Sequence, residues 1–506
     1  MLRPLTASLA LLTVVGLTAC TASGQTPGSQ PAGPTTTVTS VAVPPAELSA
    51  AAVLATLADA TTVRDDEWAA ADAVAIELLG STASSEAAAV SSAGSVVTIG
   101  AAGVYRLTGT LNGAVVVAAP EDAQVVLILN GVHITNPDGP AITVTGADDV
   151  AISLAEGSRN EVSDAASYPE EAQAHAAIHS SADLTLTGTG ALTVRGNGAD
   201  AVFTSDDLAV ISGTYTVEAA DDALVGKDSI TVEGGTLNIT AAGDGLYSDK
   251  LDDQTKGYVR IVDGQLSLAV GDDGIAATTD AVVEGGVVTV SAAGDGLHAD
   301  RVLVIEGWKV SVTASTEGLE GATVAIGGGE VNVVASDDGI NAAGSGETLT
   351  ITGGTVTVDA TGDGLDSNGS LSIAGGEVRV YGPQAGGNGI FDADGQFSIS
   401  GGTLLGIGSS GMAQTPAEGS QGWVAATLDV AAGTLVGLSD GAGAEVASVT
   451  TPRAATMILY SAPAVPAGAT YSVTAGGATI AAATQAAVSG AQRGGPGGPG
   501  GSGRRP

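Results

Sequence analysis

The sequence predicts an all-β chain that folds as a right-handed parallel β-helix, with a repeat near 22 residues and a β-rich C-terminal cap. Three observations support this prediction: a short acidic phrase recurs along the chain, a Gly-Gly pair recurs inside most repeats, and apolar residues alternate between these marks. Glycine makes up 75 of the 506 residues without a three-residue period. Many short strands joined by tight turns are typical of such a composition.

Each repeat is marked by an acidic residue, then a small residue, then an apolar one. The marks begin at Asp200, Asp222, Asp244, Asp273, Asp295, Glu317, Asp338, Asp363 and, with an amide replacing the acid, Asn388. The longest interval between marks contains an insertion at residues 250–257. A unit near 22 residues has room for three strands and three turns, and its apolar face is buried only when units stack. A propeller blade needs about 40 residues, so that fold fits the period poorly.

The apolar residues inside a repeat alternate with polar ones. Ile230 and Val232 are followed, after a Gly-Gly pair, by Leu237 and Ile239. A period of two over such short runs predicts strands with one buried face.

The N-terminus predicts a lipoprotein signal peptide at residues 1–20. Arg3 precedes an apolar run at residues 9–17 that is too short to span a bilayer, and the run ends in Leu-Thr-Ala-Cys. This ending resembles the bacterial lipoprotein box, in which the cysteine is acylated, so we expect lipidation of Cys20. The alternative is an ordinary signal peptide with an incidental cysteine. We expect an extracellular protein that is lipid-anchored to the bacterial cell membrane and contacts the membrane only through that anchor.

The rest of the chain is divided by its composition. We expect a flexible tether at residues 21–67, the β-helix at 68–410, the cap at 411–484, and a disordered Gly/Pro/Arg tail at 485–506. Residues 73–79 are expected to form a strand at the N-terminal end of the β-helix.

The charge of the chain is strongly negative. Only 16 residues are Lys or Arg, against 55 Asp or Glu, and the formal net charge is −39. Such a surface repels nucleic acid and attracts multivalent cations. We expect a monomer that binds no nucleic acid.

Stacking would align the acidic marks in one column. Neighbouring carboxylates about 4.8 Å apart repel by about 0.9 kcal/mol in water, or about 3.5 kcal/mol at an effective dielectric constant of 20. Hydrogen bonds from turn N–H groups, proton uptake or bridging cations can each offset this repulsion. Clustered carboxylates and carbonyls suit Ca²⁺, which we expect as the cofactor.

The candidate Ca²⁺ ligands are the marks and the acids near them, which we expect on one acidic edge. They are Asp222, Asp244, Asp249, Asp272, Asp273, Asp295, Asp300, Asp337, Asp338, Asp363 and Asp366. The alternative for each aspartate is that it caps its own turn. Zinc is poorly supported because His175 and His179 have no further His or Cys near them in the sequence. His298 is interpreted as a turn residue.

Several phrases give the chain a family resemblance. It resembles bacterial surface carbohydrate-binding proteins with a polysaccharide-lyase-like parallel β-helix, associated with cellulose and acidic pectic polymers. The matching phrases are VYRLTGTL at 104–111, LILNGVHITNPDGPAI at 127–142, LAEGSRNEV at 154–162, GKDSITVEGGTLNI at 226–239, GDGLYSD at 243–249 and SSGMAQTP at 409–416. The resemblance implies Ca²⁺ sites on the β-helix and glycan binding without catalysis. The chain departs from the family pattern at Ala201, Ala223, Glu317 and Asn388.

The leading hypothesis is therefore a Ca²⁺-dependent binder of a polysaccharide, with an acidic glycan favoured. The candidate glycan contacts are Trp308, Tyr247, Lys227, Lys250 and Arg301. A first alternative is a polysaccharide lyase, in which Ca²⁺ would acidify the proton beside a uronate carboxylate and a base would remove it. The candidate bases are Lys227, Lys250, Arg260 and Arg301. A second alternative is a structural or adhesive surface protein without a glycan ligand.

Overall fold

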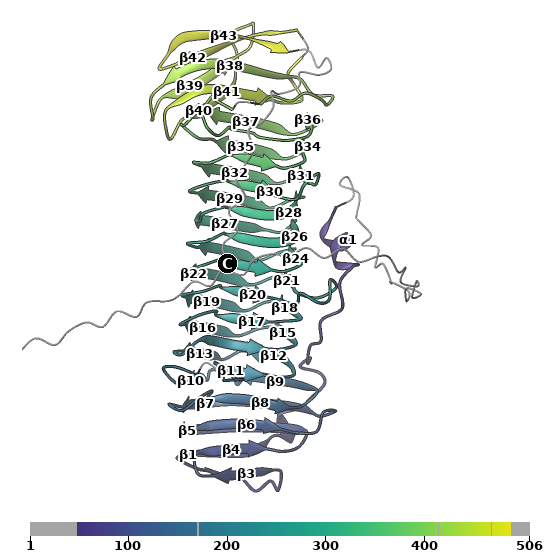
Figure 1. Ribbon diagram of the computed structural model, residues 1–506, viewed down its shortest axis with the longest axis vertical. Coiled ribbons are helices and arrows are strands. Elements are labelled where there is room, and N and C mark those ends of the chain that lie inside the picture. The colour runs from purple at the N-terminus through teal and green to yellow at the C-terminus, as the bar shows by residue number, and fades with distance from the viewer. Residues whose placement is uncertain (1–47, 170–171, 413, 467, 487–506) are drawn as a thin grey trace, which may run out of the picture. The chain divides into compact units, whose positions relative to one another are not determined.

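The computed structural model describes residues 48–169, 172–412, 414–466 and 468–486. In this part of the chain, strands form stacked coils that are followed by a small β-rich cap (Figure 1). The predicted fold class is confirmed. The predicted signal peptide, Cys20, most of the tether and nearly all of the predicted tail lie outside the described residues.

A typical coil contributes one strand to each of three parallel sheets. In one such coil, β20 (Leu246–Ser248) belongs to sheet 1, β21 (Tyr258–Ile261) to sheet 2 and β22 (Gln265–Val270) to sheet 3. Each strand pairs in parallel with its equivalents in the coils before and after it.

The three sheets are built from the following strands. Sheet 1 comprises β4 (Val96–Ile99), β6 (Ala114–Ala118), β8 (Ile142–Gly146), β11 (Ala176–Ser180), β14 (Asp200–Thr204), β17 (Leu224–Gly226), β20, β23 (Ile275–Ala277), the first parts of β26 (Leu297–Ile305) and β28 (Leu319–Ile326), β30 (Ile340–Ala342) and β33 (Leu365–Ser367). Sheet 2 comprises the first parts of β5 (Gly103–Asn112) and β7 (Gln124–Thr135), β9 (Asp149–Leu154), β12 (Asp183–Gly188), β15 (Asp207–Val210), β18 (Ser229–Val232), β21, β24 (Asp280–Val283), the second parts of β26 and β28, β31 (Thr348–Ile351), β34 (Ser370–Ile373) and β36 (Phe397–Ile399). Sheet 3 comprises the second parts of β5 and β7, β10 (Arg159–Ser163), β13 (Ala191–Gly196), β16 (Thr214–Ala219), β19 (Thr236–Ala241), β22, β25 (Val287–Ser291), β27 (Lys309–Ala314), β29 (Glu330–Ala335), β32 (Thr355–Ala360), β35 (Glu377–Tyr381) and β37 (Thr403–Gly408).

The core is a continuous column of aliphatic side chains inside the coils. The register of sheet 1 superposes one such row of residues, each at most 1% exposed: Leu224, Leu246, Ile275, Leu297, Leu319, Ile340 and Leu365. Burying one such side chain contributes about 1.5–3 kcal/mol. No coil buries this surface alone, so stability depends on the stack.

The small residue after each acidic mark lies where adjacent coils come closest. A Cβ added at Gly274 would lie 2.4 Å from the carbonyl oxygen of Gly296 and 2.4 Å from Cγ1 of Val290. Glycine is therefore required in this coil. The earlier coils accept fully buried Ala201 and Ala223 at the equivalent positions.

The stack begins with antiparallel pairs. The strand expected near residues 73–79 is β1 (Val74–Gly80), which pairs in parallel with β5 and antiparallel with β2 (Ala83–Ser84). β3 (Val90–Ala93) pairs antiparallel with β4.

Residues 48–73, which we call the strap, lie against the outward face of sheet 2 (Figure 1). The strap contains α1 (Ala50–Leu54), where the side chain of Ser49 accepts a hydrogen bond from the N–H of Ala52 at 3.2 Å, and the short helix η2 (Ala70–Asp72). The buried side chains that pack α1 onto the sheet are Ala50, Val53, Val282, Val304 and Ala325.

Polar contacts hold the extended part of the strap. The N–H of Val63 donates to Oγ1 of Thr185 at 3.0 Å, and Nη2 of Arg64 lies 2.7 Å from Oε1 of Glu233. The prediction of a flexible tether across residues 21–67 is therefore wrong for its described part. The Ala-rich composition did not indicate this order, because the segment is ordered by apolar contact with sheet 2.

The cap covers the last coil. It consists of β38 (Trp423–Val430), β39 (Leu435–Ser439), β40 (Glu445–Thr450), β41 (Ala455–Ser461), β42 (Thr470–Ala475) and β43 (Ala478–Ala486). Antiparallel pairing of β37 with β41 joins the cap to the last coil, so that this edge is covered. Among the described residues, no helix is long and apolar enough to cross a membrane.

The fit of Gly274 gives a test of coil stacking. We expect Gly274→Ala to lower the free energy of unfolding by about 1–3 kcal/mol, because the new methyl group meets backbone and Val290. The reverse change at an equivalent position, Ala223→Gly, should lower it by at most about 1 kcal/mol. Denaturant unfolding of both variants measures this, and equal losses would contradict the stacking geometry.

Candidate functional site

The acidic marks form a ladder at the corner between sheet 3 and sheet 1. Within this acid ladder, the backbone N–H of one mark donates to the carboxylate of the preceding mark. The N–H of Asp244 lies 2.7 Å from Oδ1 of Asp222, that of Asp273 lies 2.8 Å from Oδ1 of Asp244, and that of Asp295 lies 2.6 Å from Oδ1 of Asp273. Asp200, Asp295 and Asp338 accept from the next mark in the same way, and Asp363 accepts from the N–H of Gly389, the residue after the mark Asn388. Turn capping and ladder formation are thus one arrangement, in which each carboxylate caps the following coil.

Glu317 interrupts the pattern. Its longer side chain accepts a hydrogen bond from Nδ2 of Asn341 at 3.0 Å. Burial, followed by the negative charge of Glu320, raises the pKa of Glu317 to about 8. The departure noted in the sequence therefore changes the local hydrogen bonding of the ladder.

Hydrogen bonds do not offset all of the ladder's charge. Burial, with the charges of neighbouring aspartates, raises the pKa of Asp244 to about 7 and that of Asp273 to about 6, although each accepts a backbone N–H. Burial likewise raises the pKa of Asp200 to about 7 and that of Asp363 to about 6. These coils carry more buried negative charge than their protein partners neutralise.

Three of the predicted ligands converge near the middle of the stack. One oxygen each from Asp244, Asp272 and Asp273 lies within 4.8 Å of the others. Asp272 is exposed, so solvent reaches the group, while Asp244 and Asp273 are partly buried. Carboxylate oxygens are donors that Ca²⁺ prefers, and carbonyls and water complete such sites. The residues present therefore fit a Ca²⁺ ion.

A histidine lies in the next coil of the ladder. His298 faces outward on β26, with Nδ1 3.6 Å from Asp295 and 3.0 Å from Glu320, and with Nε2 3.1 Å from Asp300. Hydrogen bonds that His298 donates to Asp295 and then to Glu320 raise its pKa to about 11. The interpretation of His298 as a turn residue is wrong, because His298 lies on β26, where its ring contacts three carboxylates.

The later acids do not converge as closely. Asp337 is exposed beside Asp338 in the turn before β30. Asp366 faces outward from β33, and burial, with the charges of Asp338 and Asp363, raises its pKa to about 7. Within the described chain, the groups of three that could hold a metal ion are Asp244, Asp272 and Asp273, and Asp273, Asp295 and His298.

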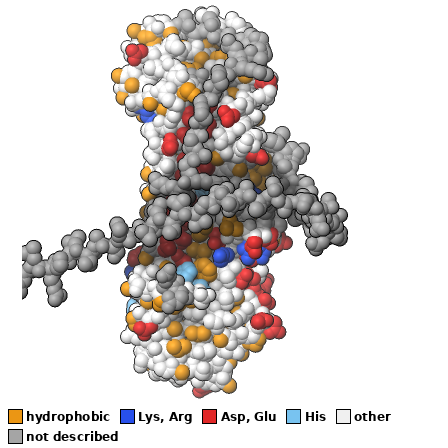
Figure 2. All heavy atoms as spheres, in the orientation of Figure 1, with side chains coloured by type: hydrophobic (Ala, Val, Ile, Leu, Met, Phe, Trp, Pro, Cys, Tyr) orange, Lys and Arg blue, Asp and Glu red, His pale blue; other side chains and the backbone are white. Residues whose placement is uncertain are grey.

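The outward row of sheet 1 runs beside the ladder, three residues after most marks. It contains His179, Phe203, Val225, Tyr247, Ala276, His298, Glu320, Asn341 and Asp366. Figure 2 shows acidic side chains gathered beside the middle coils, with histidine and basic side chains nearby. Tyr247 lies outward as the alternation predicts, and burial, with the charge of Asp249, raises its pKa to about 12.

Sequence reasoning missed the apolar part of this row. The rings of His179 and Phe203 stack with centroids 4.8 Å apart and planes 2° apart, and His175 lies 5.5 Å from Phe203. Burial lowers the pKa of His179 to about 4, so its ring is neutral near pH 7. The sequence signal that could have identified this row is the position three residues after each acidic mark.

The predicted basic contacts lie at the other end of the sheet 1 strands, and each pairs with an acid. Lys227 lies 3.3 Å from Asp249, Lys250 lies 3.1 Å from Asp228, and Nε of Arg301 lies 3.2 Å from Asp280. Asp249 directly follows β20, and Asp300 lies within β26, so a stretch of strand separates each of them from its acidic mark. The sequence spacing did not reveal this separation. Asp300 still contacts the ladder indirectly, because His298 lies between it and Asp295.

Trp308 lies at a different corner. Its side chain precedes β27, between sheet 2 and sheet 3, and is 77% exposed. The ring projects from the surface as expected, but the structure does not bring it to the ladder or to Tyr247.

Comparison with known proteins gives a consistent family. The family described as carbohydrate-binding domain-containing protein matches residues 93–347 and 295–498. A protein of that description from Acetivibrio thermocellus is 38% identical over 194 residues, which cover 37% of this chain and 68% of the relative. A solved structure described as the polysaccharide lyase-like protein from C. thermocellum shares 29% identity, covers 50% of this chain and 96% of its own, and has a TM-score of 0.41.

The His298 cluster predicts a pH-dependent contribution to stability. Because folding raises the pKa of His298 from about 6.5 to about 11, its contribution is complete below about pH 6.5 and declines as pH rises toward 11. We expect His298→Gln to lower the free energy of unfolding by about 1–3 kcal/mol at pH 6.5 and by less at pH 10. Thermal unfolding at both pH values measures this.

His133→Gln is the matched control. His133 is half exposed and lies 3.2 Å from Glu161 on sheet 3, so we expect a smaller loss. A loss for His298→Gln that stays the same at both pH values would contradict the imidazolium assignment.

Proposed function

Because the chain belongs to the family of carbohydrate-binding domain-containing proteins, we propose that it binds an acidic polysaccharide through Ca²⁺ at the acid ladder. The names of the family and the relative agree with the predicted binding role rather than an enzymatic one. The observation that carries the finer proposal is the convergence of Asp244, Asp272 and Asp273. Their partly buried charge favours a multivalent cation over an empty site.

In this proposal, Ca²⁺ neutralises the ladder and links it to carboxylates of the glycan. Asp244 and Asp273 each use one oxygen to accept a backbone N–H, which fixes the carboxylate and leaves its other oxygen for the ion. Asp272 supplies the exposed oxygen. An anionic glycan would otherwise be repelled by the net charge of −39, so the ion also makes the approach of such a glycan favourable.

The outward row supplies an apolar floor beside the ion. Phe203 and Tyr247, which are partly exposed, flank Val225, which is only 4% exposed, in adjacent coils about 4.8 Å apart along the stack. Apolar C–H faces of sugar rings pack on such side chains. A glycan running along the stack would thus contact the row with its ring faces and the ladder with its carboxylates.

The ion pairs argue against a lyase. A lyase base must be free to accept a proton from the substrate, whereas Lys227, Lys250 and Arg301 are each held by a carboxylate. They also lie across sheet 1 from the converging acids. We therefore assign them a structural role that orders the corner between sheets 1 and 2.

The proposal includes attachment to the cell surface. The predicted acylation of Cys20 would hold the β-helix at the membrane through residues 21–47. Metabolic labelling with a fatty acid, compared with Cys20→Ala, tests this part independently of glycan binding.

The calcium proposal predicts a specific loss of binding. We expect wild-type protein to be retained by immobilised polygalacturonate with Ca²⁺ and released by EDTA. Asp244→Asn with Asp273→Asn should reduce retention about tenfold or more, because amide oxygens keep the ladder's N–H bonds but lose the charge that holds the ion. Asp138→Asn, in an exposed turn, is the matched control and should bind normally.

Equal retention with Ca²⁺ and with EDTA would overturn the calcium requirement. Absence of retention on acidic and neutral glycans alike would favour the structural or adhesive alternative. Ultraviolet absorbance that rises on incubation with polygalacturonate and Ca²⁺ would instead reveal the unsaturated product of a lyase.

A further inference from the structure

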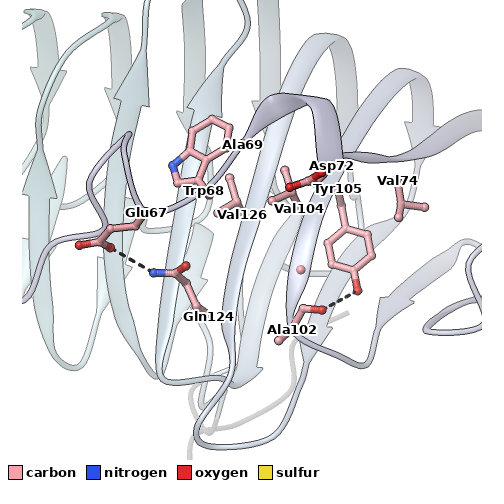
Figure 3. A pocket seen from close by; sticks show the side chains of 11 residues that line it. Glu67, Trp68, Ala69, Asp72, Val74, Ala102, Val104, Tyr105, Gln124 and Val126 are labelled. Atoms are coloured by element: carbon pink, nitrogen blue, oxygen red, sulfur yellow. Dashed lines mark hydrogen bonds between the residues drawn. The ribbon is translucent and has the colours of Figure 1, made fainter.

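A second surface of the molecule has the chemistry of a sugar site. Where the strap crosses the first coils of sheet 2, it encloses an open hollow of about 480 Å³, which we call the strap hollow (Figure 3). Glu67, Trp68 and Gln124 lie on one side, and Asp72 and Tyr105 lie on the other. This volume falls within the range of about 300–1,000 Å³ that is usual for small-ligand sites.

The walls of the hollow are fixed by the fold. Trp68 packs on an apolar cluster that contains Val63 from the strap and Val126 from β7. Nε2 of Gln124 donates to Oε2 of Glu67 at 3.3 Å, so the strap and β7 are joined at the rim. The hollow is therefore a feature of the strap and the sheet together, and neither forms it alone.

The lining combines apolar surface with hydrogen-bonding groups. The ring of Trp68 and the side chains of Val74, Val104 and Val126 provide the apolar surface. The hydrogen-bonding groups are the carboxylates of Glu67 and Asp72 and the amide of Gln124. An aromatic ring beside carboxylate and amide groups is the combination that recognises the C–H face and the hydroxyls of a sugar.

The charge of the lining selects the kind of sugar. Glu67 and Asp72 are its ionisable acids, and none of its residues is Lys, Arg or His. The guanidinium of Arg106 on β5 lies outside the lining and donates to the carbonyl oxygen of Ala70 in the strap at 3.2 Å. Within the lining, a uronate would meet two carboxylates and no cation, whereas neutral hydroxyls or an ammonium group would not meet this repulsion. This preference is opposite to that of the acid ladder, where Ca²⁺ would recruit negative charge.

We propose that the strap hollow is a second saccharide subsite, which takes a sugar unit without negative charge, either a neutral hexose or an amino sugar. The inference rests on the carbohydrate-binding role of the family and does not require the ladder's Ca²⁺. Because the strap hollow lies on sheet 2 and the ladder borders sheet 1, one molecule then binds two polysaccharides of different charge on different faces of the coils.

Tryptophan fluorescence tests the proposal directly. The chain contains three tryptophans, and Trp423 is only 9% exposed, so Trp308→Phe leaves Trp68 as the reporter exposed to ligand. In this full-length background with EDTA, we expect a neutral cello-oligosaccharide or a chitosan oligosaccharide to change the emission saturably. An oligogalacturonate should cause no change at the same concentration.

Two variants locate the binding. Asp72→Asn changes one exposed lining carboxylate without altering packing, and we expect at least a threefold loss of affinity for the sugar that binds, largest for the amino sugar. Trp68→Phe, assayed by calorimetry in the wild-type background, should weaken binding at least tenfold. Asp122→Asn, an exposed acid in the turn before β7 and outside the lining, is the matched control and should bind as the parent does.

The strap-hollow proposal and the ladder proposal can be overturned independently of each other. Three results would each overturn the strap-hollow proposal. They are a saturable response to oligogalacturonate in EDTA, no response to either the neutral or the amino oligosaccharide, and an affinity in both Asp72→Asn and Trp68→Phe that equals that of the parent protein. Asp244→Asn with Asp273→Asn should leave the response intact. In the wild-type protein, a strap-hollow response without any calcium-dependent binding of polygalacturonate would overturn the ladder proposal and support this one.

Discussion

The spacing between stacked coils is the constraint on which the rest of the structure depends. Parallel strands lie about 4.8 Å apart, so any residue type that recurs at one position of the repeat must contact its own copies. For leucine and isoleucine this contact builds the core. For aspartate it brings like charges together. The ladder is thus a direct consequence of the repeat, and the protein offsets its repulsion differently from coil to coil.

The ladder shows several ways to hold a buried carboxylate. A backbone N–H from the next coil binds one oxygen of Asp222, Asp244 and Asp273, which lowers their repulsion without removing their charge. At Asp295 the imidazolium of His298 provides a fixed positive charge. Beside Asp272, three carboxylates converge, and this is the group at which we propose an external cation. The chemistry therefore differs within a column that looks uniform in sequence.

Much of the fold could be predicted because its determinants are periodic. The acidic marks, the Gly-Gly pairs and the alternation of Ile230 with Val232 each repeat, and together they specify the coil. The strap could not be predicted, because its order comes from contact with sheet 2 rather than from any period of its own. An Ala-rich segment has the same composition whether it packs on a sheet or extends into solvent.

The site was predictable in its acids and not in its surroundings. Convergence of Asp244, Asp272 and Asp273 follows from the register, and the outward position of Tyr247 follows from alternation. The role of His298 and the ion pair of Lys227 with Asp249 depend on side chains in neighbouring coils. The sequence of a single repeat does not show which residues of adjacent coils come into contact. The strand register, which only the structure gives, aligns the third residues after the marks in one outward row.

Proton release on calcium binding tests the central claim most directly. Burial raises the pKa of Asp244 to about 7 and that of Asp273 to about 6, well above about 3.9 in an unfolded chain, so cation-free protein holds protons in the ladder near pH 6.5. Calcium added in a pH-stat at pH 6.5 should release protons from the wild type, less from Asp244→Asn, and almost none from either at pH 9. Calcium binding without proton release at pH 6.5, or no calcium binding, would contradict the account.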